Sequence, residues 1–472
     1  MKDTKFYITT PIYYANAAPH IGHAYTTVAA DVLTRFHKLQ GEEVFFLTGM
    51  DEHGMKIQKA AEVQNKQPQE FVDGIAEIFQ ALWKKLNIEN TNFIRTTDAA
   101  HKTAVQKVLQ TLLDKGAIYK GTYEGLYCVG CEQFKNEGDL VSGKCPDHGT
   151  VPEFTKEESY MLKMTDIQAE LLAKIEKNEF QIAPEKYKNE IVSFLKGQTL
   201  NDVSISRKNV AWGVPLPFDA SHTTYVWVDA FLNYLTGLGW DGDEKKLPAQ
   251  WPVDVNLIGK DILRVHATIW PAILIHLGIA LPRMLFTHGH ILSGGKKMSK
   301  TVGNVISIDD MLEKFGTDGT RYLLLSAGTF GDDVDVTMER MVEKYNSDLA
   351  NGLGNLVSRV VKLCEGFEIE LVRSEYDHLI WNKGFMESLW LDKAVDRIWD
   401  HLVRKSNKFI DDNKPWDLKK TDEIKFREVM GKLFSELYFI AEVLDPFMPE
   451  TAAKIKTALE TKKVEPLFLR IK

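Results

Sequence analysis

The first fifty residues constrain the fold most strongly, because their pattern is that of one strand–helix–strand unit. Residues 5–10 are typical of a short strand, and residues 11–19 of a loop interrupted by two prolines. A helix with one apolar stripe is predicted to begin near His20, and a buried strand at residues 44–48 then leads to Asp51. This unit predicts an α/β fold with a doubly wound parallel sheet, whose ligands lie beyond the C-terminal ends of the strands.

The rest of the chain changes in texture along its length. Two long helical patterns are followed by a turn-rich stretch that holds three of the four cysteines and is predicted to be an insertion. A sheet-like pattern resumes at residues 225–228, and after about residue 341 the pattern is helical almost throughout. The sequence therefore predicts the two halves of one sheet domain, an insertion, a linker and an all-helical bundle. In chain order these are residues 1–115 (first half), 116–224 (insertion), 225–325 (second half), 326–345 (linker) and 346–472 (bundle).

Composition excludes several classes of protein. The 472 residues are 44% hydrophobic and 26% charged, which excludes disordered and fibrous chains. Two uncharged stretches, residues 6–30 and 265–282, are interrupted by prolines and histidines, so neither is predicted to cross a membrane. The net charge of −8 means that any contacts to a polyanion come from local clusters. We expect a soluble cytoplasmic protein of several domains.

Four metal-ligating side chains form two close pairs within the predicted insertion. Cys128 and Cys131 are separated by two residues, as are Cys145 and His148, and thirteen residues lie between the pairs. Tetrahedral Zn²⁺ takes four nitrogen and sulfur ligands from such turns, and the alternative is three unrelated thiols with a surface histidine. Because all four positions would be filled by protein, the sequence predicts one structural zinc ion.

Two short motifs contain groups suited to binding phosphates. His20 and His23 flank Gly22 at a predicted helix start, where free backbone N–H groups and the helix dipole favour an anion. Lys297 and Lys300 follow a pair of glycines, and their ammonium groups could neutralise a pyrophosphate. Taken one at a time, surface histidines and a solvated lysine loop are the competing interpretations.

Together the two motifs resemble the paired signatures of class I aminoacyl-tRNA synthetases, which activate an amino acid with ATP on a Rossmann-type fold. The stretches Pro11–His23, Gly49–Gly54, Trp227–Tyr234 and Ile258–Trp270 resemble four motif blocks of the methionyl-tRNA synthetases. The resemblance extends from Tyr7 to Lys472 and favours the form with a single zinc knuckle. It implies catalytic roles for His20, His23, Lys297 and Lys300, and binding of ATP by these four residues with Gly22 and Asp261.

The same resemblance implies a methionine pocket in which Asp51 binds the substrate's amino group. Its members are Ile12, Tyr14, Asp51, Trp227, Ala230, Tyr234, Ile262, His266 and Trp270. Physical chemistry agrees, because a thioether prefers aromatic neighbours, and His266 and Trp270 lie four residues apart on one predicted helix face. For each aromatic side chain taken alone, ordinary core packing is the more frequent role. The insertion is also too short to hold a large hydrolytic editing domain.

In the helical bundle the resemblance implies binding of the tRNA anticodon by Asn355, Arg359 and Trp416. Asn355 and Arg359 lie one helical turn apart, and Trp416 could stack on an unpaired base. A half-buried tryptophan at a helix start is the ordinary structural interpretation of Trp416. The remaining Cys364 is predicted to be a core residue.

The sequence therefore predicts an ATP-dependent methionine–tRNA ligase whose partners are methionine, ATP with Mg²⁺, and tRNA(Met). A synthetase for another amino acid or an adenylyltransferase of the same fold is the first alternative. A non-catalytic tRNA-binding paralogue is the second. Because the chain stops at Lys472, without the appended domain through which many relatives dimerise, we expect a monomer.

Overall fold

The computed structural model describes residues 5–130, 133–135, 137–146, 149–208, 210–298, 305–369 and 377–472. They group into two compact units. The first unit comprises Met1–Pro19, Glu43–Leu82 and Asn90–Thr287, and the second comprises His20–Glu42, Trp83–Glu89 and His288–Lys472. These units divide the chain differently from the five segments predicted from the sequence, because the first helix is grouped with the last third of the chain.

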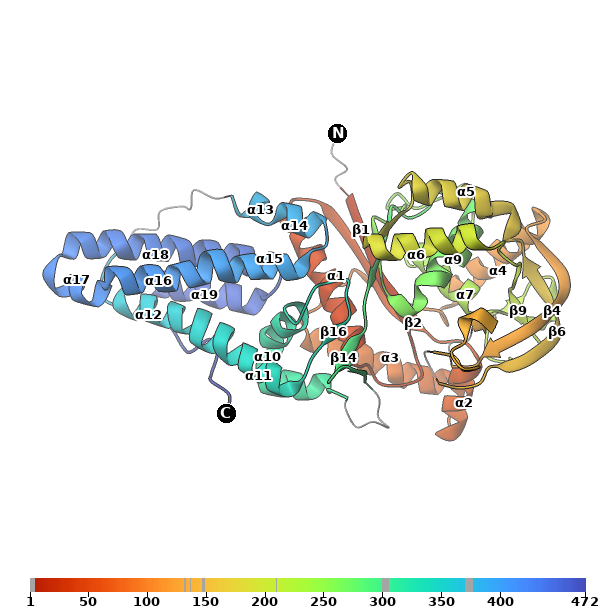
Figure 1. Ribbon diagram of the computed structural model, residues 1–472, viewed down its shortest axis with the longest axis horizontal. Helices are drawn as coiled ribbons and strands as arrows, with labels where there is room; N and C mark the ends of the chain where they lie inside the picture. Colours follow the sequence, from red (N-terminus) through yellow and green to blue (C-terminus); the bar gives the residue numbers. More distant parts are fainter. Residues whose placement is uncertain are drawn as a thin grey trace. The chain divides into compact units, whose positions relative to one another are not determined.

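A six-stranded sheet forms the centre of the first unit (Figure 1). Its order is β3 (Asn92–Arg95), β2 (Glu43–Asp51), β1 (Lys5–Tyr14), β12 (Val255–Gly259), β13 (Met284–His288) and β7 (Gln181–Ala183). The pairs β1–β2, β1–β12, β2–β3 and β13–β7 are parallel, which confirms the predicted sheet type. The strand order reverses between β1 and β12, and ligands of such sheets bind at this switch point.

Two local predictions around this sheet are wrong. The predicted loop from Pro11 is strand as far as Tyr14, because the β1–β2 register shifts between Thr9 and Ile12. Such an irregularity accommodates a proline, which has no N–H to donate to a ladder. Residues 225–228 are not strand either, since they enter helix α7 (Val226–Phe231), which is buried over its whole length and therefore lacks amphipathic periodicity.

Most helices of the first unit follow the predicted apolar patterns. The predicted patterns at residues 68–86 and 99–115 correspond to α3 (Pro68–Lys85) and α4 (Ala99–Asp114). The uncharged stretch at 265–282 lies in the largely buried helix α9 (Leu263–Leu277) as far as residue 277. The further helices are α2 (Met55–Val63), α8 (Asn233–Thr236) and the 3-10 turn η2 (Lys260–Ile262). Among the described residues, no helix combines the length and the apolar character needed to cross a bilayer.

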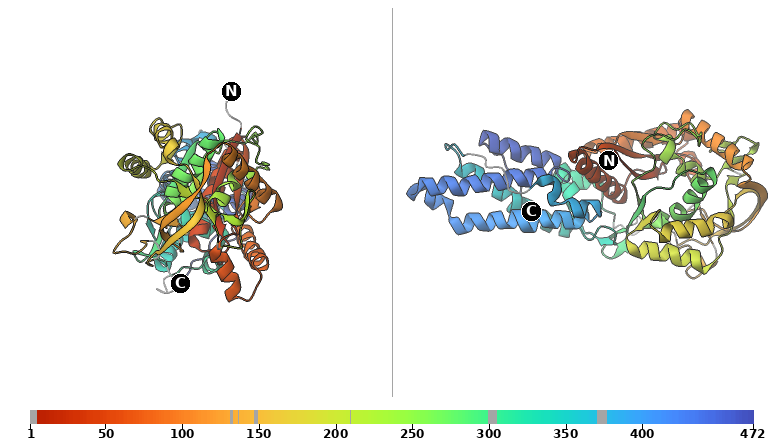
Figure 2. Two further views of the ribbon diagram at one scale, coloured as in Figure 1. Left: turned by 90° about the vertical axis from the view of Figure 1, so that its right-hand side faces the viewer. Right: turned by 90° about the horizontal axis from the view of Figure 1, so that it is seen from above.

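The predicted insertion contains two small antiparallel sheets and a helix pair. The long strands β4 (Ile118–Cys128) and β6 (Glu153–Leu162) pair along most of their length. Helices α5 (Thr165–Glu176) and α6 (Glu185–Gly197) lie side by side (Figures 1 and 2). The short strands are β5 (Gln133–Lys135), β8 (Val203–Ser204), β9 (Ser206–Arg207), β10 (Pro215–Leu216) and β11 (Asp219–Thr224). The insertion is not separate from the main sheet, because β7 lies within it and pairs with β13.

In the second unit, α1 (Ile21–Leu39) begins as predicted, with His20 at its N-cap. The predicted linker 326–345 is structured, since β16 (Val334–Asp335) pairs with β14 (Ile291–Ser293) and α11 (Met338–Lys344) follows. The remaining early elements are β15 (Lys296–Lys297) and α10 (Ile308–Leu325). Short polar strands of this kind have too little apolar alternation to stand out in a sequence.

The predicted all-helical bundle is confirmed in the described residues (Figure 1). Of its first predicted stripe, Leu349, Leu353, Leu356 and Val360 are fully buried and Leu363 is half-buried. Cys364 is a core residue as predicted. Burial raises the pKa of the Cys364 thiol to about 12. The elements are η3 (Tyr345–Gly354), α12 (Asn355–Leu363), α13 (His378–Trp381), α14 (Lys383–Glu387), α15 (Leu391–Ile398), η4 (Trp399–Val403), α16 (Arg404–Asn413), α17 (Pro415–Thr421), α18 (Glu423–Leu444) and α19 (Pro449–Thr461).

Candidate active site

The predicted methionine residues gather at the C-terminal edge of the main sheet, in the first unit. Ile12 and Tyr14 lie at the end of β1, and Asp51 pairs with Tyr14 as the last residue of β2. Ile262 follows β12 across the switch point and, like Ile12 and Tyr14, packs partly buried against the hydrophobic core. The Asp51 side chain is buried, with 4% of its surface exposed. One buried carboxylate beside apolar groups suits a ligand with a cationic end and an apolar end.

Helices α7, α8 and α9 add a cluster of aromatic rings to this edge. The ring of Phe231 lies at its centre, with centroids 4.9 Å from His266, 5.6 Å from Trp227 and 5.9 Å from Trp270. Tyr234 lies 5.8 Å from Trp270, and Tyr14 meets Trp227 edge to face at 6.4 Å. Ala230, also predicted for the pocket, is buried on α7. The structure thus brings the predicted aromatic residues together, and Phe231 is a member that sequence reasoning did not select.

Two hydrogen bonds fix the tautomer of His266. Its Nδ1 lies 2.9 Å from the Ile262 carbonyl, which can only accept, so Nδ1 carries the proton. Its Nε2 therefore accepts from the hydroxyl of Tyr234, 2.9 Å away. Burial lowers the pKa of His266 to about 4, although the Ile262 carbonyl opposes part of this shift. The imidazole is consequently neutral at physiological pH and presents no charge to the apolar cluster.

This pKa predicts a loss of stability in acid. The unfolded chain has a histidine pKa of about 6.5, so between that pH and about 4 the unfolded state binds the extra proton. Protonation of His266 therefore leaves the free energy of unfolding unaffected well above pH 6.5. Below that pH it lowers the free energy of unfolding, by about 2 kcal/mol at pH 5. Urea unfolding at pH 7.5 and 5 should show a smaller difference in His266→Gln than in the wild type. Equal differences in both proteins would contradict the prediction.

The segment that follows Asp51 is anchored on two sides. Glu52 is buried, and its carboxylate accepts from Arg95 Nε at 2.7 Å and from the hydroxyl of Thr97. His53 donates instead to Asp229 on α7, and Asp229 also contacts His101 on α4. Sequence reasoning missed these partners. Two of these residues could have been found from their positions in the sequence, because Asp229 lies between Trp227 and Ala230 and His53 lies two residues after Asp51. His101 lies near no predicted site residue in the sequence.

In the second unit, the two motif histidines cap helix α1 reciprocally. His20 Nδ1 accepts from the backbone N–H of Gly22 at 3.1 Å, and His23 Nδ1 accepts from the backbone N–H of His20 at 3.2 Å. The two rings stack with centroids 3.7 Å apart. A Cβ on Gly22 would lie 3.0 Å from the His20 ring, so glycine is needed for this stack. The predicted common face for the two imidazoles is thereby confirmed.

These caps determine which ring nitrogens can donate to a ligand. Because both Nδ1 atoms accept, each ring carries its proton on Nε2. Burial and the neighbouring His20 hold the pKa of His23 well below its ordinary value, so His23 is neutral at pH 7. The pair therefore offers two Nε2–H donors beside a helix N-terminus, an arrangement suited to phosphate oxygens.

The lysine motif belongs to the same unit as α1, and the segment just before it forms a hydrogen bond with α1. The backbone of Lys297 pairs with Leu292 in the β14–β15 hairpin. Just before this hairpin, His288 Nε2 lies 2.7 Å from the hydroxyl of Thr26, one helical turn beyond Gly22. Lys300 and the side chain of Lys297 lie outside the described residues. Asp261, predicted to bind ATP, lies exposed in η2 of the first unit, immediately after β12.

Two of the four predicted zinc ligands, Cys128 and Cys145, are buried in the insertion. Cys128 pairs with Gln133 across a hairpin. The carbonyl of Cys145 accepts from the backbone N–H of Gly149 at 2.7 Å. The structures of Cys131 and His148 lie outside the described residues. Among those described, no group of three or more potential ligands could hold a metal ion.

The predicted anticodon residues share one face in the helical bundle. Arg359 on α12 lies over the ring of Trp416 at 5.6 Å and pairs with Asp411 at 2.6 Å. Trp416 has 38% of its surface exposed, and Asn355 is exposed one turn before Arg359. The structure therefore brings the three residues together on an accessible surface, which is compatible with base stacking.

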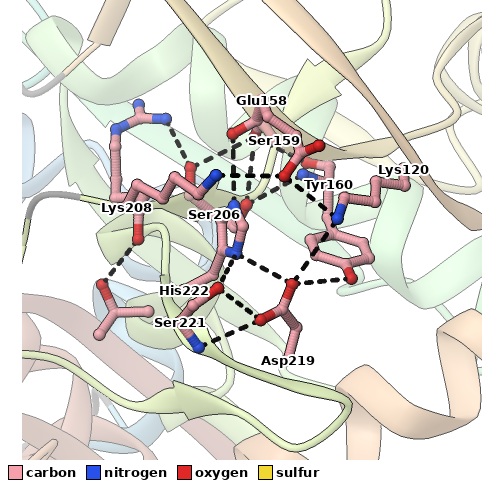
Figure 3. Close-up of polar contacts among 11 residues, drawn as sticks. Lys120, Glu158, Ser159, Tyr160, Ser206, Lys208, Asp219, Ser221 and His222 are labelled. Atoms are coloured by element: carbon pink, nitrogen blue, oxygen red, sulfur yellow. Dashed lines mark hydrogen bonds and ion pairs between the residues drawn. The ribbon is translucent and has the colours of Figure 1, made fainter.

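A polar cluster in the insertion holds a serine, a histidine and an aspartate (Figure 3). In a nucleophilic triad the two ring nitrogens of the histidine face different partners. Here His222 Nδ1 lies 3.2 Å from both Ser221 and Asp219, and its Nε2 faces a backbone carbonyl at 3.3 Å. The Ser221 hydroxyl donates to Asp219 at 2.6 Å. This geometry does not activate Ser221 as a nucleophile.

Comparison with known families relates this site to known chemistry. The family described as tRNA synthetases class I (M) matches residues 6–150 and 148–361. The methionine–tRNA ligase of Clostridium acetobutylicum is 45% identical over 96% of this chain and 73% of the relative. The methionine–tRNA ligase of Rickettsia bellii is 41% identical over 98% of this chain and 94% of the relative.

Solved structures give the same relationship. Methionyl-tRNA synthetase from Mycobacterium tuberculosis in complex with methionyl-adenylate matches with a TM-score of 0.89 and 37% identity, over 96% of this chain and 93% of that chain. Its free form matches with a TM-score of 0.80 and 34% identity, over 96% and 91% respectively. The similarity therefore extends over nearly the whole length of both chains.

Proposed function

We propose how substrates bind in this chain, which belongs to the class I methionyl-tRNA synthetase family. Its activity is the ATP-dependent ligation of methionine to tRNA through methionyl-adenylate. The observation that supports this function most directly is the aromatic cluster beside the buried Asp51 at the switch point of the sheet.

We propose that the methionine side chain lies among the rings of Trp227, Phe231 and His266. A polarisable, unbranched thioether gains from aromatic edges, and a neutral His266 keeps this environment apolar. The Asp51 carboxylate binds the substrate's ammonium group, a charge-assisted contact strengthened by burial. Ile12 and Ile262 complete the apolar wall.

The phosphate groups of ATP are proposed to bind at the start of α1. The Nε2–H groups of His20 and His23 donate to phosphate oxygens, and Gly22 leaves the helix N-terminus accessible. The ammonium groups of Lys297 and Lys300 are proposed to neutralise the charge that develops on the leaving pyrophosphate. Asp261 is proposed to contact the nucleoside part of ATP.

The reaction needs positioning and electrostatics, with no covalent bond to the enzyme. A carboxylate oxygen of methionine attacks the α-phosphorus of ATP, the bond from this phosphorus to the bridging oxygen breaks, and pyrophosphate leaves with the electron pair. The 2′-hydroxyl of the terminal tRNA adenosine then attacks the carbonyl carbon of the adenylate. AMP leaves, and the hydroxyl proton goes to solvent or to the phosphate.

ATP–pyrophosphate exchange with each amino acid in turn tests this function. Methionine should support exchange, and norleucine should support it more weakly because it lacks the sulfur. Exchange driven by another natural amino acid would contradict the specificity. Failure of every amino acid to support exchange would favour the non-catalytic tRNA-binding alternative.

We propose one structural zinc ion held by Cys128, Cys131, Cys145 and His148. The two described cysteines fit this role, because each is buried at a tight turn. Zinc would hold the two turns together and takes no part in the reaction. Metal analysis should find one zinc per chain, and Cys145→Ser should lose it, whereas Cys364→Ser should retain it. Equal zinc content in both variants would contradict the assignment.

We propose that the anticodon of tRNA(Met) binds the surface of Asn355, Arg359 and Trp416. The stacked Arg359 and Trp416 pair supports this placement, because a guanidinium held over an exposed indole is pre-organised to contact a base. The cytoplasmic location, the monomeric state and the Mg²⁺ that accompanies ATP stay predictions from the sequence.

A further inference from the structure

Three buried polar side chains meet behind the candidate methionine pocket. Asp229 on α7 lies between two histidines, with its Oδ2 2.7 Å from His53 Nδ1 and its Oδ1 2.9 Å from His101 Nε2. All three side chains are at least 96% buried, because their exposed fractions are 4% or less. Both carboxylate oxygens of Asp229 thus accept from a ring N–H. Burial acts to raise the pKa of Asp229, but electrostatic attraction to His53 together with these hydrogen bonds holds it below its ordinary value.

The carboxylate determines the tautomer of each histidine. His53 must carry a proton on Nδ1 and His101 a proton on Nε2, since a carboxylate can only accept. His101 Nδ1 lies 2.7 Å from the hydroxyl of Thr236, which is the shorter of the two contacts of that hydroxyl. Both ring nitrogens of His101 are thus engaged, one by the Asp229 carboxylate and the other by the Thr236 hydroxyl.

The network connects two segments that the proposed reaction needs in fixed positions. His53 lies two residues after Asp51, and Gly54, with a φ of 110°, lets the chain turn into α2 directly afterwards. Asp229 lies on α7 between Trp227 and Ala230 of the pocket. Glu52 is bonded to Arg95, which does not lie on α7. The described side-chain hydrogen bond that links the segment after Asp51 to α7 is therefore the one from His53 to Asp229.

We propose that Asp229 is a positioning residue for methionine binding, acting through His53 to hold the Asp51 segment against the helix that carries the pocket. This inference rests on the proposed function of the pocket. It assigns to Asp229 no contact with the substrate. Asp229 is instead proposed to fix the distance between the Asp51 carboxylate, which would bind the ammonium group, and the aromatic rings, which would bind the thioether.

Asp229→Asn tests the proposal with little change of volume. The amide replaces one accepting oxygen by a donating NH₂ group, which then faces a histidine N–H, so that one of the two bonds is lost. We expect the KM for methionine to rise about tenfold or more, with the KM for ATP within about twofold of the wild type. A control is Asp254→Asn, because that carboxylate likewise accepts two hydrogen bonds in the same unit, from the Tyr7 backbone N–H and from Arg283, and has no part in the network.

Variants of His53 separate positioning from general destabilisation. His53→Asn places an amide donor where Nδ1 stands and should keep the KM for methionine within about threefold, whereas His53→Ala should resemble Asp229→Asn. The double variant His53→Ala/Asp229→Asn should be no worse than the worse single variant, because both remove the same link. Equal defects in His53→Asn and His53→Ala would overturn the proposal.

Nitrogen-15 NMR of the imidazole rings gives a readout that does not depend on catalysis. The imidazole signal that is absent in His53→Asn identifies His53, which should be protonated on Nδ1 in the wild type. In Asp229→Asn, His53 should lose this tautomer. If the amide oxygen of the new asparagine faces His53 instead, the tautomer of His101 should change. Unchanged tautomers of both rings in Asp229→Asn, or an unchanged methionine KM in a variant that has lost the His53 bond, would overturn the inference. Absence of methionine-dependent exchange in the wild type would instead overturn the proposed function.

Discussion

Lys300→Ala is expected to lower the rate of adenylate formation by about 10²- to 10³-fold. Its ammonium group is proposed to act on the charge that appears as the bond to pyrophosphate breaks, so its contribution is larger in the transition state than in the bound state. Methionine is proposed to bind in the pocket of the first unit, and its dissociation constant should therefore stay within about twofold. Single-turnover formation of methionyl-adenylate and equilibrium binding of methionine measure the two effects separately.

The neighbouring lysine provides a matched control for this variant. Lys296 is exposed in β15, four residues before Lys300 in the sequence, and Lys296→Ala removes an equal charge outside the family signature. Its rate should remain within about twofold of the wild type, because general screening of the nucleotide charge is weak at exposed positions. A large loss of methionine affinity in Lys300→Ala, or equal rate losses in both variants, would count against the assigned role.

The parts of the fold that the sequence predicts correctly have strong local periodicity. The apolar stripe of α1 and its N-cap at His20 gave the start of the first helix. The long uncharged stretch that forms α9 was correctly assigned to a buried helix, since its histidines and proline argued against a membrane span. Such segments bury one face or all faces of a long element, which leaves a clear pattern.

The errors arise where tertiary context overrides local preference. Pro11 suggested the end of a strand, yet the register irregularity beside it lets β1 continue to Tyr14, where the ligand edge lies. The apolar run at residues 225–228 is too short to distinguish a strand from a buried helix by its pattern alone. The strand β7 belongs to the main sheet only through its pairing with the distant β13.

The residues of the candidate site also fall into two groups, those that short sequence motifs indicate and those that only the folded structure brings together. His20, His23 and the aromatic residues were selected because they stand in short stretches that resemble motif blocks of the family. The Asp229 network was not found, since its partners His53 and His101 are 176 and 128 residues away in the chain. Polar pairs that form only on folding leave no local pattern, even where they hold the pocket in shape.

A second buried polar pair lies wholly within the second unit and consists of Arg321 on α10 and Asp31 on α1. The guanidinium of Arg321 lies 2.7 Å from Asp31, and both side chains are fully buried. The remaining donors reach the backbone carbonyls of Phe447 at 2.9 Å, and of Leu86 and Pro446 at 3.0 Å. One planar side chain thus satisfies three carbonyls and one carboxylate from three separate segments, which no other residue type can do.

Arg321→Met is therefore expected to destabilise the protein by about 3–5 kcal/mol, because it leaves buried acceptors without donors and a buried aspartate with less compensation. Asp31 keeps its contact with Arg35, which is why the loss is not larger. The shift of the urea midpoint measures the effect. Arg404→Met is the matched control, since its ion pair with Asp400 is exposed and worth less than about 1 kcal/mol. Equal shifts in the two variants would show that the buried arginine contributes no more than a surface charge.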